Sequence, residues 1–407
     1  MIIDLPSISS AALNRKLVDL RDTGGAVALG RVLTLVIVTD EHHAEEAIDA
    51  ANQASREHPC RVVVIATANR RGADRMDAQI RVGGDAGASE VIVLRLYGKL
   101  AAHGASVVTP LLLADSPVVV WWPEDAPLSP SEDPIGAMGQ RRITDAAESR
   151  SPRRELDRRR ENYAPGDTDL AWTRTTKWRG LLAAALDQPP YEPVTQVTVT
   201  GATNSPSTDL LAAWLSETLK CEVVRARMPS GTGIFGVRLL RRGGPIDLVR
   251  ADGNVATLSQ PGQPDRRISL PRRSLTECLA EELRRLDPDE IYAAVLSHGL
   301  PRLTASRSVA ASTAAKKGAA PAPGESRRQA VKARQHEEAT AEAIQKATPS
   351  DSTTSRRTRA SSARSTATKT TATRRAATKS TTTKPTTTKP TTKRAGDAKP
   401  AARGTAR

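Results

Sequence analysis

Apolar runs separated by amphipathic segments dominate the first half of the chain. Residues 32–38 and 62–65 are almost continuously apolar and rich in valine and isoleucine, a pattern typical of strands buried on both faces of a sheet. Between them, residues 41–56 have the pattern of a helix, and a further helix is expected from Ser10 onwards. This succession predicts a β-α-β unit.

The same alternation continues to residue 122. Further strands are predicted at residues 77–82, 90–96 and 118–122, with a helix over residues 98–114. Strands that alternate with helices favour an α/β domain with a mainly parallel sheet. Residues 123–134 are rich in Pro, Asp and Ser. They predict a long loop at the carboxyl end of a strand, where functional loops gather in such sheets.

A change of pattern near residue 190 marks the expected domain boundary. Residues 150–160 carry six arginines and predict an exposed helix or linker, and residues 172–186 predict a helix that ends before Pro189 and Pro190. Beyond them come a strand, a helix over residues 205–220, another strand, hairpin signals between residues 235 and 258, and a helix over residues 274–286. We therefore expect an α/β domain at residues 1–190 and an α+β domain at residues 191–300.

The last 107 residues differ in composition from the rest. Residues 301–407 contain no Phe, Tyr or Trp and hold 24 Lys and Arg against 6 Asp and Glu. The first 300 residues, with 36 basic and 39 acidic side chains, have a net charge of −3. Residues 301–407 have too few apolar side chains to offset the entropy of ordering the backbone. Their composition therefore predicts a disordered basic tail.

Cysteine usage and the N-terminus indicate a cytoplasmic protein. Cys60, Cys221 and Cys278 are odd in number and far apart, which argues against a disulfide framework or a zinc site. The first residues lack the charged flank and apolar run of a secretory signal, and no apolar run is long enough to span a membrane.

Two motifs that suggest chemistry fit a structural explanation better. Gly231–Gly236 matches Gly-x-Gly-x-x-Gly, but it precedes an alternating strand pattern instead of a helix, so a glycine-rich turn is favoured over a nucleotide site. His42 and His43 are adjacent, and no third ligand has a suitable spacing, so two surface histidines are favoured over a metal site. We expect no catalytic, cofactor or metal site.

The region around the predicted loop holds the candidates for partner binding. Trp121 and Trp122 should point to opposite faces of their strand, leaving one of them for a partner. Arg141, Arg142 and Asp145 could present donors to an anionic group, although a solvated helix start is the favoured interpretation. Cys60 could act as a redox switch, although a buried inert thiol is favoured.

Six segments in a fixed order resemble the OpcA family of glucose-6-phosphate dehydrogenase assembly proteins of actinobacteria. They are residues 57–62, 112–123, 141–145, 167–174, 178–187 and 205–215. The resemblance spans roughly residues 1–300 and leaves out the tail. It implies an accessory protein that is not an enzyme and that binds glucose-6-phosphate dehydrogenase, promotes its active oligomer or activates it allosterically, and so supports NADPH supply from the oxidative pentose phosphate pathway.

Two alternatives from other classes remain open at this point. An enzyme could use the carboxyl ends of the first-domain strands to act on a sugar phosphate. The basic tail could instead contact nucleic acid or another polyanion weakly, through a salt-dependent interaction that does not read sequence.

Overall fold

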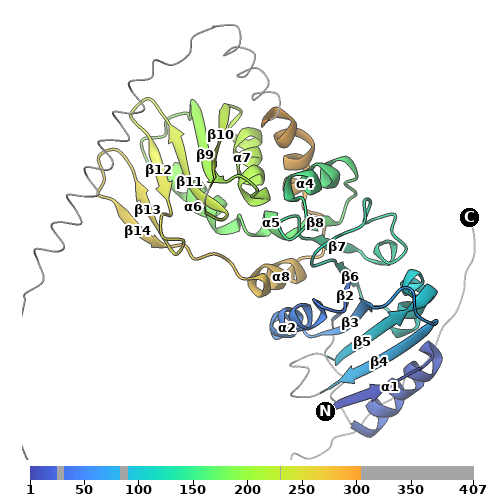
Figure 1. Cartoon of the computed structure of the whole chain (residues 1–407). Coiled ribbons are helices and arrows are strands. Elements are labelled where there is room, and N and C mark those ends of the chain that lie inside the picture. Colours follow the sequence, from blue (N-terminus) through green and yellow to red (C-terminus); the bar gives the residue numbers. More distant parts are fainter. Residues whose placement is uncertain (25–31, 83–89, 230, 304–407) are drawn as a thin grey trace, which may run out of the picture. The chain divides into compact units, whose positions relative to one another are not determined.

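Two β-sheets organise the described part of the chain (Figure 1). The structure is a computed structural model that describes residues 1–24, 32–82, 90–229 and 231–303. The predicted disordered tail, residues 301–407, lies outside the described residues except for its first three. Its predicted disorder is therefore not tested.

The first sheet has eight strands in the order β1-β4-β5-β3-β2-β6-β7-β8. Strands β5, β3, β2, β6, β7 and β8 run parallel, while β4 pairs with β5 and β1 pairs with β4 in antiparallel fashion. The prediction of a mainly parallel α/β sheet is thus confirmed. The bounds are β1 (Ile2–Leu5), β2 (Leu33–Asp40), β3 (Cys60–Thr67), β4 (Arg75–Arg81), β5 (Glu90–Tyr97), β6 (Val118–Trp121), β7 (Arg141–Thr144) and β8 (Asp167–Asp169).

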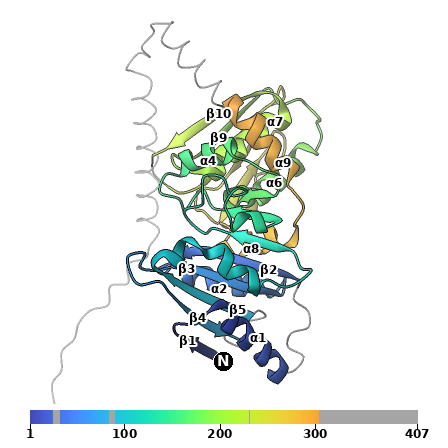
Figure 2. The ribbon, with the colours of Figure 1, turned by 90° about the vertical axis from the view of Figure 1, so that its right-hand side faces the viewer.

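Helices cover both faces of this sheet (Figure 2). One face packs against α2 (Ala44–Ala54) and against α8 (Leu275–Arg284), which returns from the C-terminal part of the described chain. The other face packs against α1 (Ser10–Gly24), α3 (Gly104–Val108) and the 3-10 turn η4 (Thr109–Leu111). Trp121 and Trp122 belong to opposite cores, which confirms that they point to opposite faces.

Two predictions for this sheet were wrong. The helix expected over residues 98–114 is divided into η3 (Gly98–Ala102), α3 and η4. His103 leaves helical geometry, and Pro110 has no N–H with which to continue a helical ladder. The segment expected to start a solvated helix, residues 140–146, instead contains the buried strand β7. Pairing with β6 and β8 outweighs the polar character of its two arginines.

Two short helices, α5 (Leu170–Thr173) and α6 (Thr176–Leu186), lie between the two sheets along the chain. Within the first sheet, η5 (Gly136–Met138) lies between β6 and β7, and α4 (Pro152–Glu161) lies between β7 and β8. The arginine-rich segment forms α4 as expected, but Glu155, Leu156 and Arg159 are buried. The buried side chains of α6 share a core with the second sheet. The boundary near residue 190 remains a prediction, and this packing links α6 to the residues that follow it.

The second sheet is mixed, with six strands in the order β10-β9-β11-β12-β13-β14. Strands β9 and β10 are parallel and joined by α7, whereas the remaining pairs are antiparallel. The bounds are β9 (Gln196–Ala202), α7 (Pro206–Leu219), β10 (Glu222–Met228), β11 (Ile234–Leu240), β12 (Ile246–Val249), β13 (Val255–Ser259), β14 (Arg266–Ser269), α9 (Glu290–Ala294) and the π-helical turn η6 (Val295–Gly299).

Within the described ranges, no helix combines the length and the apolar character needed to cross a bilayer.

Candidate functional site

Acidic side chains gather where the parallel strands of the first sheet end. Asp40 ends β2, Asp169 ends β8, Asp145 follows β7, and Glu124 lies three residues after β6. Because these neighbouring strands run parallel, their carboxyl ends lie at one edge of the sheet, where ligands bind in open α/β folds.

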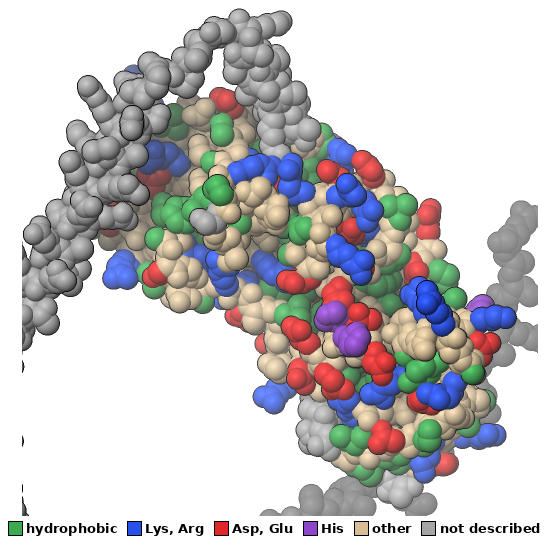
Figure 3. All heavy atoms as spheres, in the orientation of Figure 1, with side chains coloured by type: hydrophobic (Ala, Val, Ile, Leu, Met, Phe, Trp, Pro, Cys, Tyr) green, Lys and Arg blue, Asp and Glu red, His purple; other side chains and the backbone are tan. Residues whose placement is uncertain are grey.

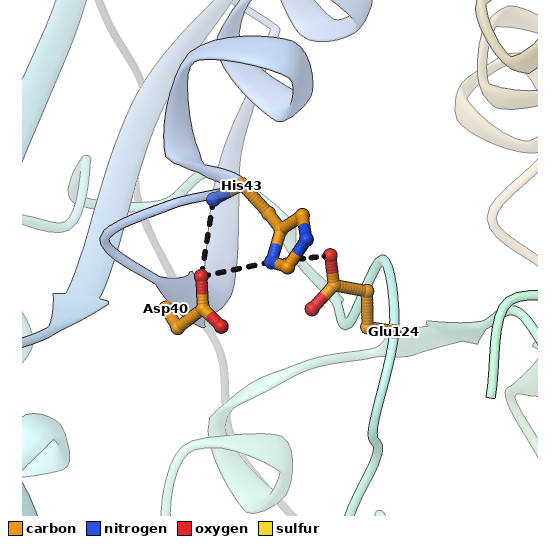
Figure 4. Close-up of side chains that lie close together, drawn as sticks. All are labelled: Asp40, His43 and Glu124. Atoms are coloured by element: carbon orange, nitrogen blue, oxygen red, sulfur yellow. Dashed lines mark hydrogen bonds and ion pairs between the residues drawn. The ribbon is translucent and has the colours of Figure 1, made fainter. Parts of the chain in front are cut away.

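The side chains of Asp40, His43 and Glu124 form a cluster at this edge (Figure 4). Nδ1 of His43 lies 2.8 Å from Oδ1 of Asp40 and 2.8 Å from Oε1 of Glu124. Asp40 also accepts backbone N–H bonds from His42 and His43, which order the turn before α2. Spacing along the sequence offers His43 no third ligand, and in the structure Glu124 comes beside it from the segment after β6, which is distant in sequence.

Burial and hydrogen bonding shift the two carboxyl pKa values in opposite directions. Partial burial by itself would raise the pKa of Asp40, but the hydrogen bonds from His43 and His42 lower it overall. Partial burial raises the pKa of Glu124, and the charges of Asp40 and Asp125 add to this against the opposing effect of His43.

The cluster has two chemical capabilities. Its three ligand atoms all lie within 4.8 Å of one another, and one imidazole with two carboxylates is a ligand set that zinc accepts. The same atoms also satisfy one another through hydrogen bonds without an ion. Figure 3 shows histidine side chains among acidic ones on this face of the molecule.

The cluster lines a pocket of about 650 Å³, which we call the acidic pocket. Its lining includes five carboxylates, those of Asp40, Glu46, Glu124, Asp125 and Glu148. Three arginines complete the charged lining, namely Arg150, Arg174 and Arg273. Arg174 also lines two further pockets, of about 160 and 420 Å³, next to the second sheet.

Each predicted partner-binding charge is paired with a group from another element. Arg141 donates to Oε2 of Glu282 in α8 at 2.5 and 3.0 Å, and Arg142 donates to Asp167 at 2.5 Å. Asp145 accepts two hydrogen bonds of 2.6 Å from Arg174. All three predicted residues are buried.

The remaining sequence candidates are also buried. Trp121 and Trp122 are 0% and 3% exposed, so neither ring reaches solvent. Cys60 lies in the core at the start of β3, as the favoured interpretation expected. A redox role for Cys60 and a partner contact by any of these residues remain predictions.

Asp169 is the most strongly perturbed carboxyl group of this edge. It is completely buried and accepts hydrogen bonds from Thr144 at 2.7 Å and from the backbone N–H groups of Ala146 and Ala171. Burial, together with the charge of Asp145, raises the pKa of Asp169 to about 7 despite these hydrogen bonds.

Sequence reasoning missed Glu124 and Arg174 as parts of the site. A signal for Glu124 existed, because a carboxylate soon after a predicted parallel strand is expected at the shared edge. Arg174 lies in a helical segment and carries no such signal. It reaches the pockets because Asp145 fixes its guanidinium in a bidentate pair.

Comparison with known proteins matches two consecutive segments of the chain to family models. One family model, described as the N-terminal domain of the glucose-6-phosphate dehydrogenase subunit, matches residues 51–161. A second, described as the C-terminal domain of the same subunit, matches residues 165–296. No curated protein matches the chain.

Solved structures with low similarity include several oxidoreductases. An oxidoreductase from Sinorhizobium meliloti is 11% identical, with a TM-score of 0.39 over 68% of this chain and 97% of its own. UDP-N-acetylglucosamine 3-dehydrogenase GnnA from Acidithiobacillus ferrooxidans is 10% identical, with a TM-score of 0.35 over 67% and 97%. Glucose-6-phosphate 1-dehydrogenase from Mycobacterium avium is 10% identical, with a TM-score of 0.33 over 67% and 92%.

At this level of similarity the solved structures carry no argument about function. The two family models do, because they match consecutive segments in the expected order and together cover more than half of the chain. The chain belongs to the OpcA family of glucose-6-phosphate dehydrogenase assembly proteins.

Proposed function

We propose that this chain binds glucose-6-phosphate dehydrogenase and promotes its active oligomer or activates it allosterically, without catalysing a reaction itself. The observation that carries the proposal is the match of both family domains, over residues 51–161 and 165–296. An activator must bind the active state of its target more tightly than the inactive state, because only that difference shifts the population.

The segment after β6 supports one assignment of the contact surface. Residues 123–135 leave the carboxyl edge of the sheet and carry Leu128, whose side chain is 61% exposed. Arg159 of α4 donates hydrogen bonds to the carbonyl oxygens of Pro127 at 2.6 Å and Leu128 at 3.1 Å. A single exposed leucine is ordinary on a protein surface, so its place on a held segment at the carboxyl edge of the sheet is what supports Leu128 as the contact.

Two of the buried sequence candidates, Trp122 and Arg142, contact this segment or the residues that follow it. A Cβ added to Gly136 would lie 1.8 Å from the carbonyl oxygen of Pro130 and 3.0 Å from the Trp122 ring, so the segment packs closely over that ring. Arg142 donates to the carbonyl oxygen of Gly139 at 2.9 Å. We propose that Trp121, Trp122, Arg141, Arg142 and Asp145 support the contact surface and that Leu128 touches the dehydrogenase.

The test measures dehydrogenase activity across substrate concentrations with and without the purified full chain. We expect the chain to lower the apparent KM or raise the kcat, and we expect Leu128→Asp to weaken this effect at least roughly ten-fold in the concentration required. Tyr191→Asp is the matched control, because Tyr191 is also apolar and exposed but lies on a different segment.

Three results would each count against one part of the proposal. No effect of saturating wild-type chain on the dehydrogenase would overturn the activator role. If Leu128→Asp and Tyr191→Asp are equally potent, the contact surface does not lie on the segment 123–135. The activator role would still stand. Turnover of glucose 6-phosphate by the chain alone would overturn the proposal that it is not an enzyme.

The two alternative functions gain no support. Neither family model describes an enzyme of sugar phosphates that acts without the dehydrogenase. The polyanion contact would use residues 301–407, which both matches leave out.

A further inference from the structure

A second pocket beside Arg174 has only positive charges in its lining. This pocket of about 160 Å³, which we call the cationic pocket, has five basic side chains and no carboxylate in its lining. The basic residues are Arg174, Lys177, Arg250, Arg272 and Arg273. They come from α5–α6, from the end of β12 and from the segment before α8, so the fold brings together cations that are far apart in sequence.

Three of these cations are neutralised from outside the pocket. Arg174 pairs with Asp145 at 2.6 Å, Arg273 with Glu281 at 2.5 Å and Lys177 with Glu277 at 3.4 Å. Among the described residues, no carboxylate lies within ion-pair distance of Arg250 or Arg272. Two of the five cations are thus left without an ion-pair partner in the part of the chain that the structure describes.

Arg250 is one of these two cations, and its guanidinium is largely buried. The residue is only 6% exposed, and its two Nη atoms donate to the carbonyl oxygens of Leu270 and Ile234 at 3.0 Å. Its Nε atom has no hydrogen-bond partner. Burial, reinforced by the charge of Arg272 and opposed by that of Asp252, lowers the pKa of Arg250 to about 10. A buried guanidinium without a carboxylate is costly unless an anion compensates it.

The backbone around the pocket also favours an anion. Ser207, in the first turn of the 14-residue helix α7, lines the pocket, and N–H groups at a helix start attract negative charge. Gly233 lines it as well, with a φ of +70°, and Arg272 donates to the side chain and carbonyl oxygen of the neighbouring Thr232. The Gly-x-Gly-x-x-Gly segment thus contributes a turn at the pocket, although it opens no helix.

The adjoining pocket of about 420 Å³ gives a ligand room beyond the anionic group. It shares Arg174, Ser207, Gly233 and Arg272 with the cationic pocket. Its further lining includes Asn204, Ser205 and Gly231 together with one carboxylate, that of Glu148. A compact anion in the first pocket could therefore carry a larger polar group that occupies the second.

We propose that the cationic pocket binds the phosphate group of a small phosphorylated metabolite. A phosphate dianion matches both the number of unneutralised cations and the fork of donors that an arginine presents. This site belongs to the chain itself, so the proposal does not depend on the contact with the dehydrogenase.

The test is calorimetric titration of the full chain with inorganic phosphate, without the dehydrogenase. We expect saturable binding by the wild type, weakened on the order of ten-fold by Arg272→Gln, since a charge-assisted hydrogen bond is lost. Arg267→Gln is the matched control: Arg267 is exposed on β14 and outside the pocket lining, and the basic tail is identical in both variants.

Lys177→Met provides a second variant should Arg272→Gln disturb the Thr232 turn. The proposal is overturned if wild-type chain binds no phosphate, or if Arg272→Gln and Lys177→Met both bind it as tightly as Arg267→Gln does.

Glucose 6-phosphate and NADP⁺ then serve as competing probes that distinguish the carrier of the phosphate. Tighter binding of either one than of inorganic phosphate, with the same loss in Arg272→Gln, supports a metabolite site and identifies its class. If both bind no more tightly than inorganic phosphate, the assignment to a phosphorylated metabolite fails.

Discussion

The acidic and cationic pockets share Arg174 and Arg273 but differ in how their charges are balanced. At the acidic edge of the first sheet, carboxylates face His43 and arginines within the chain, and the buried charges of β7 and the residue after it form pairs with other elements. In the cationic pocket, Arg250 and Arg272 have no carboxylate partner among the described residues. Balanced charges of the first kind hold elements together, whereas unbalanced charges of the second kind favour an external ligand.

The largest loss of stability is expected when a buried carboxylate is removed from the paired charges of the first sheet. Glu282 joins α8 to Arg141 of β7 and also accepts a hydrogen bond from Thr173. Glu282→Ala leaves the buried Arg141 without its partner and should lower the free energy of unfolding by about 3–5 kcal/mol. Urea unfolding measures this change, with Glu290→Ala, at an exposed position, as the control. Equal stability of the two variants would show that the pair does not tie α8 to the sheet.

The pH dependence of stability tests the burial of Asp169. An unfolded chain releases this proton near the ordinary pKa of 3.8, whereas the folded chain holds it until about pH 7. Between these values the folded state binds more protons, so its contribution to stability is fully present below pH 3.8 and is lost as the pH rises through 7.

Asp169→Asn should remove this slope, which amounts to about 4 kcal/mol at most because each pKa unit corresponds to 1.36 kcal/mol. The measurement is urea unfolding of wild type and variant at several pH values from 4 to 8. A difference between the two chains that does not change with pH would contradict the raised pKa.

The smallest effect is expected at the half-exposed cluster. The side chain of His43 is 49% exposed, so solvent screens its contacts with Asp40 and Glu124. His43→Ala should therefore change the free energy of unfolding by less than about 1 kcal/mol at neutral pH. A loss as large as that of Glu282→Ala, measured in the same urea experiment, would place the cluster with the buried structural pairs.

The pattern of apolar and polar residues along the chain was sufficient to predict most of the strands and helices. The runs at Leu33–Asp40 and Cys60–Thr67 form neighbouring parallel strands as expected, because continuous β-branched stretches favour burial on both faces. The strand of Trp121 and the helix of Trp178 were also found. Strand β7 was missed because its arginines resemble a solvated segment until Glu282 and Asp167 are known to neutralise them.

The site was harder to predict than the fold because its members meet only in three dimensions. His43 and Glu124 are joined by the pairing of β2 with β6. The cationic pocket depends on a chain path that returns from β12 and β14 to α8, and no local spacing shows that Arg174 and Arg272 share one pocket. The family resemblance supplied the partner, but it did not indicate which side chains are exposed.

The most direct test of the central claim is a titration of glucose-6-phosphate dehydrogenase activity with the full chain at subsaturating substrate. Activity that rises to a plateau as the chain is added, with Leu128→Asp displaced to higher concentration than Tyr191→Asp, is the predicted result. A flat titration curve, with the chain folded and in excess over the dehydrogenase, would contradict the account.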